Sequence, residues 1–87
     1  MGKICQPNTE AIWLNFQCFG KGQIKIWEYK AAKFEKPFQE AMRKLGITSA
    51  EFDEVTYQHF PVDRNKTLEE LELPNGGIII IKTKATF

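Results

Sequence analysis

Hydrophobic and polar residues alternate over two neighbouring stretches in the first third of the chain. Between residues 11 and 19 the apolar positions on one face are Ile12, Leu14, Phe16 and Cys18. Because successive side chains of a strand point to opposite faces, this period of two predicts a half-buried strand. Gly20 and Gly22 tolerate the positive φ angles of a tight turn, so residues 23–30 are predicted to return antiparallel and complete a hairpin.

The period changes near Lys33 from that of a strand to that of a helix. Apolar residues now recur at spacings of three and four, at Phe34, Phe38, Met42 and Leu45, which predicts an amphipathic helix. Pro37 fits its first turn, where the missing N–H would have no partner, so the helix should begin near Glu35 or Lys36. Gly46 is the expected end of the helix.

Four consecutive isoleucines, Ile78 to Ile81, form the most apolar stretch of the chain. β-branched residues favour extended backbone, and apolar side chains on both faces are typical of an interior strand. A further strand is predicted over Val55 to Tyr57, with both end residues pointing inward. A bend and at most a very short edge strand are predicted at residues 61–62.

These elements in order predict an α+β fold of ββαββ type. The first and last strands would pair in parallel, which needs a long crossover that the helix provides. The expected sheet is mixed, with order 2-1-5-3-4, and packs on one helix. We expect residues 1–10 to form a flexible leader and residues 11–87 to form a single domain.

Charge and cysteine content narrow the class of partner. Lys and Arg number 12 and Asp and Glu 11, for a formal net charge of +1, which gives no electrostatic case for nucleic acid or an anionic membrane. Cys5 and Cys18 lack a CxxC spacing and are expected to be reduced thiols. Because no apolar run is long enough for a membrane span or a signal peptide, we expect an intracellular protein, cytoplasmic or nuclear.

Candidate chemistry for catalysis is sparse in this sequence. His59 is the one histidine, and no other histidine or cysteine stands at metal-ligand spacing from it. The acidic runs are interpreted as solvated faces, and no glycine-rich loop precedes a helix in the way that phosphate binding requires. We therefore expect no catalytic site, no metal and no cofactor.

Residues 12–83 resemble the ubiquitin-like β-grasp superfamily. QIKIWEYKAAKFEKPFQEAMRKLGI, residues 23–47, is similar to the second strand and helix of SUMO-like domains, and TLEELELPNGGIIII, residues 67–81, is the most family-like phrase. The resemblance implies a protein-interaction module. Conjugated modifiers end in a flexible tail finishing in Gly-Gly, whereas Gly76 and Gly77 precede the predicted last strand, so we expect a module that is not itself conjugated.

The resemblance also implies two ways of binding at the second strand. A SUMO-like domain receives an extended peptide along this strand, which here would use a groove lined by Ile24, Ile26, Phe34 and Phe38, with Lys25, Lys30 and Lys33 near the rim. The alternative is that the four apolar residues are simply core. A second functional alternative is a Ras-effector-like domain that presents the same three lysines to a small GTPase.

The ubiquitin apolar patch has no close counterpart in this sequence. On the family pattern it would map to Thr56, Ile80 and Lys82, with a threonine at its centre. Recognition by ordinary ubiquitin receptors is therefore not expected.

The outward face of the predicted sheet gives a candidate site that depends least on the family. Trp27, Trp13 and Ile80 are expected side by side across three strands, and Ile78 or Tyr29 could extend the row. Large exposed aromatic residues are costly unless something covers them. The cover could be the leader or Phe87, or the aromatics could pair across strands to stabilise the sheet. Otherwise the two tryptophans anchor a partner or a homodimer.

Overall fold

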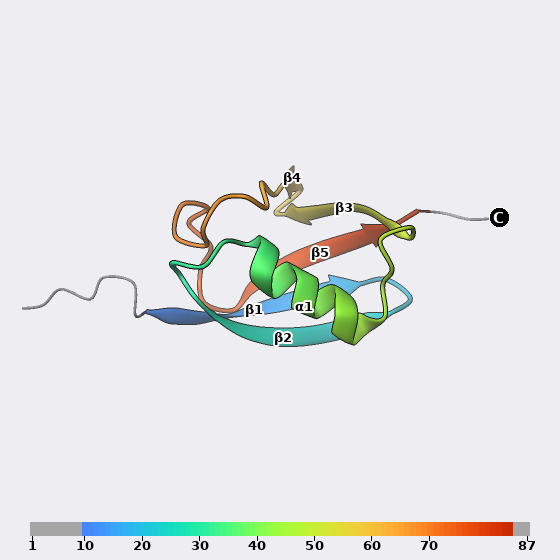
Figure 1. Ribbon diagram of the computed structural model, residues 1–87, viewed down its shortest axis with the longest axis horizontal. Coiled ribbons are helices and arrows are strands. Elements are labelled where there is room, and N and C mark those ends of the chain that lie inside the picture. Colours follow the sequence, from blue (N-terminus) through green and yellow to red (C-terminus); the bar gives the residue numbers. More distant parts are fainter. Residues whose placement is uncertain (1–9, 85–87) are drawn as a thin grey trace, which may run out of the picture.

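Five strands and one helix make up the part of the chain that this computed structural model describes, residues 10–84. In chain order they are β1 (Ala11–Cys18), β2 (Gly22–Tyr29), α1 (Glu35–Leu45), β3 (Phe52–Tyr57), β4 (Phe60–Pro61) and β5 (Gly77–Thr83). Figure 1 shows α1 lying across one face of the sheet and leaving the other face without a covering helix. The predicted leader, apart from Glu10, lies outside the described residues, as do Cys5 and Phe87.

The sheet has the predicted order, β2-β1-β5-β3-β4. β1 and β2 are antiparallel, with Ala11 opposite Tyr29. β1 and β5 are parallel, with Leu14 opposite Gly77, and β3 runs antiparallel to β5. The chain reaches β5 from β1 through α1, as a parallel pair requires. The predicted ββαββ fold class is therefore confirmed.

The helix has the predicted bounds. Pro37 lies in its first turn, and α1 ends at Gly46, which adopts a left-handed conformation with φ 74°. The N–H of Ile47 then donates to the carbonyl of Met42 at 2.9 Å, so the last turn is capped in the way glycine permits. The apolar stripe of α1 lies against the sheet, and its Phe38 and Ala41 are fully buried.

The core lies between α1 and the inner face of the sheet. Its fully buried members include Leu14, Phe16, Phe34, Phe38, Leu68 and Ile79. The even positions of β1 point inward as predicted, because the strand keeps its period of two without interruption. On β3, Val55 is buried and Tyr57 is half-buried.

One strand of the sheet is longer than predicted, and another buries a charged residue on its inward face. β3 begins at Phe52, three residues before the predicted strand, because a register shift between Phe52 and Glu54 lets the Phe52 ring pack on that of Phe38, with centroids 5.2 Å apart. Glu28 continues the inward face of β2 and is buried. Its Oε2 accepts a hydrogen bond from the Tyr29 N–H at 3.1 Å and lies 3.7 Å from Lys36 Nζ.

Candidate functional site

The face of the sheet opposite α1 carries half-exposed aromatic side chains. Trp13 on β1 is 48% exposed, Trp27 on β2 is 47% exposed, and Tyr29 is exposed to a similar extent. Their odd positions follow from the same alternation that buries the even positions of β1. The predicted outward direction of these three residues is therefore confirmed.

Trp13 and Trp27 lie directly opposite each other on β1 and β2. The Trp13 N–H donates to Asn75 Oδ1 at 2.8 Å, and the Trp13 carbonyl accepts from the Gly76 N–H at 2.6 Å. Both backbone groups of Trp13 thus point toward β5, so Trp13 and Trp27 form a non-hydrogen-bonded pair, in which facing side chains are closest. The Trp27 ring also meets the Tyr29 ring edge-on, with centroids 4.9 Å apart, so Tyr29 extends the aromatic row.

The prediction that Ile80 lies beside Trp13 as the third member of the row was wrong. Ile80 lies opposite Gln17 rather than Trp13, which is four residues or about 13 Å farther along β1. The cause is the turn before β5: Asn75 and Gly76 dock on Trp13, so the first isoleucine, Ile78, comes opposite Asn15. Ile78 is half-exposed and lies closer to the tryptophans than Ile80 does.

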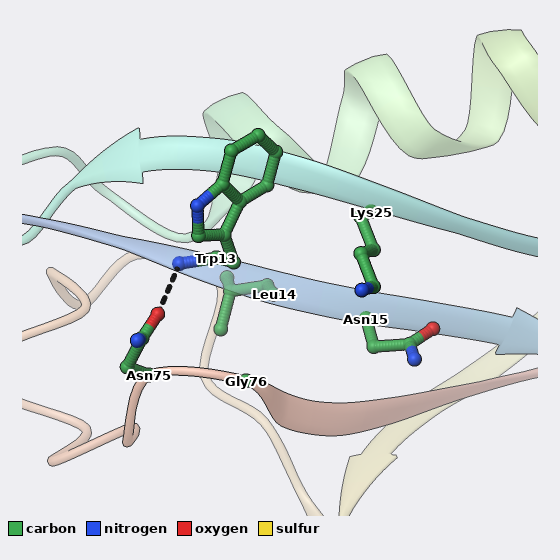
Figure 2. A pocket seen from close by; sticks show the side chains of 6 residues that line it. All are labelled: Trp13, Leu14, Asn15, Lys25, Asn75 and Gly76. Carbon is green, nitrogen blue, oxygen red and sulfur yellow. Dashed lines mark hydrogen bonds between the residues drawn. The ribbon is translucent and has the colours of Figure 1, made fainter.

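A hollow opens on this face beside Trp13. It is lined by Trp13, Leu14, Asn15, Lys25, Asn75 and Gly76. Figure 2 shows the Trp13 ring at one end and Lys25 and Asn15 at the other, with Lys25 reaching from β2 toward β1. Asn15 and Lys25 are direct cross-strand partners.

The polar groups of this hollow are incompletely matched within the described part of the chain. Asn15 Oδ1 is buried and has no hydrogen-bond partner there. Among residues 10–84, the ion pairs do not include Lys25. The hollow therefore combines an aromatic wall, one unneutralised cation and one unsatisfied acceptor.

The three lysines expected near one groove are not brought together. Lys25 belongs to the outer face, whereas Lys30 pairs with Glu10 at 3.2 Å beyond the end of β2. Lys33 lies in the following loop, where its backbone bridges to Thr67. Phe34 and Phe38 are fully buried, so the core alternative is correct for these two residues.

The free edge of β2 is nevertheless partly open. In a non-hydrogen-bonded pair the backbone groups point away from the partner strand, so the N–H and C=O groups of Lys25 and Trp27 face the free edge. At Tyr29 this edge is closed, because its N–H donates to Glu28 Oε2 and its carbonyl accepts from the Ala32 N–H at 3.1 Å. A strand could pair with β2 only before Tyr29.

The sequence interpretation missed two exposed aromatics and the residues that position Trp13. Phe19, at the β1–β2 turn, is fully exposed, and Phe60 at the start of β4 is largely exposed. Phe19 could have been suspected, because it breaks the alternation directly before a glycine. Asn75 could not, because its side chain acts across 62 residues of sequence.

Groups that could carry other chemistry are few in the described residues. No cluster of three potential metal ligands occurs among residues 10–84, and the helix in that range falls short of the length and apolar character needed to cross a membrane. The Cys18 thiol is buried, and that burial raises its pKa, with the nearby Lys21 partly opposing the shift.

Comparison with known proteins gives a likeness in structure but none in sequence. No family model matches the chain, and no curated protein matches it. Among solved structures, ubiquitin from Caldiarchaeum subterraneum is similar with a TM-score of 0.76 and 13% identity, over 88% of this chain and 98% of that one.

Two further structures give the same result. A protein designed de novo on the basis of ubiquitin has a TM-score of 0.72 and 14% identity, over 88% of this chain and 93% of its own. A chain from a structure described as molecular mimicry of SUMO that promotes DNA repair has a TM-score of 0.73 and 10% identity, over 87% of this chain and 95% of that one. At such identities the likeness is one of fold.

Proposed function

The chain has the ubiquitin-like β-grasp fold, and on that premise we propose that it is a non-catalytic protein-interaction module whose outer sheet face binds a protein partner. The observation that carries this proposal is the aromatic row of Trp13, Trp27 and Tyr29, half-exposed on a face that no helix among residues 10–84 covers. Tryptophan and tyrosine are the residues that most often dominate the energy of protein interfaces.

The size of this patch supports a binding role. Trp13, Trp27, Tyr29 and Ile78 each expose about half of their surface, and an aromatic side chain can bury about 150 to 250 Å2. Together they leave roughly 400 Å2 of largely apolar surface exposed on one face, and patches of this size on monomers are often functional. Cross-strand pairing alone would stabilise the sheet but would not cover this surface.

The fold also supports the proposal that the chain is not itself conjugated. Gly76 docks on β1 and Gly77 begins β5: the Gly76 N–H donates to the Trp13 carbonyl, and Gly77 pairs with Leu14. Cleavage after Gly77 would remove β5, which lies between β1 and β3.

The open edge of β2 favours a second candidate function. The backbone groups of Lys25 and Trp27, which pair with no strand among residues 10–84, could accept an added strand, from an extended peptide or from a small GTPase as in Ras-effector-like domains. The basic residues expected to assist are dispersed, with Lys30 held by Glu10. Binding steered by charge at this edge should weaken steeply as salt rises, whereas apolar binding on the outer face should not.

A pull-down with variants tests the proposed face. Wild-type chain, the double variant Trp13→Thr with Trp27→Thr, and the control Phe19→Thr are immobilised and exposed to cell extract, and the retained proteins are identified by mass spectrometry. Threonine favours strands, so the double variant should keep its fold. The control removes an exposed aromatic from the β1–β2 turn rather than from the aromatic row.

We expect the wild type and the control to retain the same partner and the double variant to lose it. Light scattering on each protein shows whether that partner is a second copy of the chain. If the double variant retains the partner, or if it unfolds while Trp13→Thr and Trp27→Thr alone bind as the wild type does, the tryptophans belong to the structure and the outer face is not the interface.

A further inference from the structure

The hollow beside Trp13 contains a cation that the described chain does not neutralise. Lys25 lies directly across from Asn15 and lines the hollow with Trp13 and Asn75. Two lysines elsewhere on the molecule have acidic partners, in contrast: Lys82 lies 3.2 Å from Glu54, and Lys21 lies 3.5 Å from Glu51. Within residues 10–84 no ion pair reaches Lys25.

The aromatic row is too small for a dimer of this chain built on it alone. A stable protein interface of standard size buries about 800 Å2 on each partner, whereas the three residues of the aromatic row together with Ile78 offer roughly half of that. Two copies facing each other would also bring two unneutralised Lys25 ammonium groups to the same interface. Size and charge therefore both favour a short segment of a different protein over a second copy.

We propose that this hollow binds a short partner segment in which a carboxylate side chain stands next to a large apolar one. The inference rests on the proposed function and specifies the chemistry of the partner. The apolar side chain packs against Trp13. The carboxylate accepts hydrogen bonds from Lys25 Nζ, because the Lys25 side chain extends from β2 toward β1.

Peptides that bind the immobilised chain are selected from a random display library. The winners, meaning these selected peptides, are synthesised and their affinities for the chain are measured. Affinities are compared for the wild type, Lys25→Met, Lys25→Glu and the control Lys33→Glu, which makes the same charge change in the loop after β2. We expect an acidic residue adjacent to a Leu, Ile, Phe or Trp among the winners. Lys25→Glu should weaken binding about ten-fold or more, because a charge-assisted pair at an interface is lost and reversed.

A charge swap makes the result specific. A winner whose acidic residue is replaced by Lys should bind the wild type weakly and regain affinity for Lys25→Glu. Lys25→Met should fall between the wild type and Lys25→Glu, because it keeps the apolar stem but loses the ammonium group. Lys33→Glu should bind as the wild type does.

Several results would overturn this inference while leaving the proposed function standing. They are winners without an acidic residue, equal effects of Lys25→Glu and Lys33→Glu, or no winners at all from the library although the pull-down partner depends on Trp13 and Trp27. Self-association that the tryptophan variants abolish would also overturn it, because the occupant would then be a second copy. Winners that bind the tryptophan double variant unchanged would overturn both proposals.

Discussion

Gly76 sets the register of β5 against β1, and its substitution is the most informative test of how the site is built. Its φ is 82°, a left-handed conformation, and its N–H donates to the Trp13 carbonyl. A Cβ added at Gly76 would meet no heavy atom within 4 Å. Gly76→Ala should therefore cost only the backbone term, about 1–2 kcal/mol for an L-residue with a left-handed backbone.

Two neighbouring variants separate backbone strain from crowding. Gly76→Asn should cost less than Gly76→Ala, because asparagine tolerates left-handed φ angles. Gly77→Ala has no such strain, but its Cβ would lie 3.2 Å from the Pro74 carbonyl oxygen and 3.4 Å from Tyr57 Cε1. Its cost of about 1–3 kcal/mol should come from overpacking.

The free energy of unfolding from urea titrations measures all three variants, and thermal melting provides a check. Each kcal/mol lost should lower the melting temperature by about 4–8 °C for a domain of this size. If Gly76→Asn costs as much as Gly76→Ala, the left-handed backbone is not the cause, and the explanation of the β5 register fails.

Three further predictions concern other parts of the chain. Gln58 and His59 both have positive φ, 52° and 73°. His59→Gly should therefore stabilise the chain by about 1 kcal/mol through the β3–β4 turn, measured as a rise in melting temperature. If the melting temperature does not rise, the backbone of His59 is not strained. Hydrogen bonding from Thr48 to the exposed Glu51 lowers the pKa of that carboxyl. The wild type should be more stable than Glu51→Gln above the ordinary pKa of Glu51, and this advantage should vanish as pH falls through the lowered pKa. A difference in melting temperature between the two proteins that stays constant over the acidic pH range would refute this prediction. Burial raises the pKa of Cys18, so its labelling by a thiol reagent should be slow until the chain unfolds, and stability should fall as pH rises through the raised pKa. Fast labelling at Cys18 itself in the native chain, located by peptide mapping, would contradict this.

The sequence predicted the elements of this fold because their periods are regular. The alternation of residues 11–19, the helical spacing from Phe34 to Leu45 and the isoleucine run each coincide with an observed element. The sheet order followed, because an apolar strand such as Ile78 to Ile81 needs neighbours on both sides. The inward and outward faces of β1 needed no information beyond the period of two.

The candidate site was only half predictable. Trp13 and Trp27 could be paired from the hairpin alone, because the turn fixes the register of adjacent antiparallel strands. The position of Ile80 could not, because the parallel register of β5 depends on the Asn75 side chain and the Gly76 backbone docking on Trp13. Such long-range side-chain contacts leave no periodic signal in the sequence.

The most direct test of the proposed face uses the two indole N–H signals in the NMR spectrum, because the chain contains two tryptophans. The purified partner from the pull-down, or a selected peptide, is titrated into the labelled chain. Binding on the outer face predicts that the indole signals of Trp13 and Trp27 shift or broaden with the backbone signals of Asn15 and Lys25. Saturation of binding with both indole signals unchanged, and with shifts confined to Phe19 or Phe60, would contradict the account.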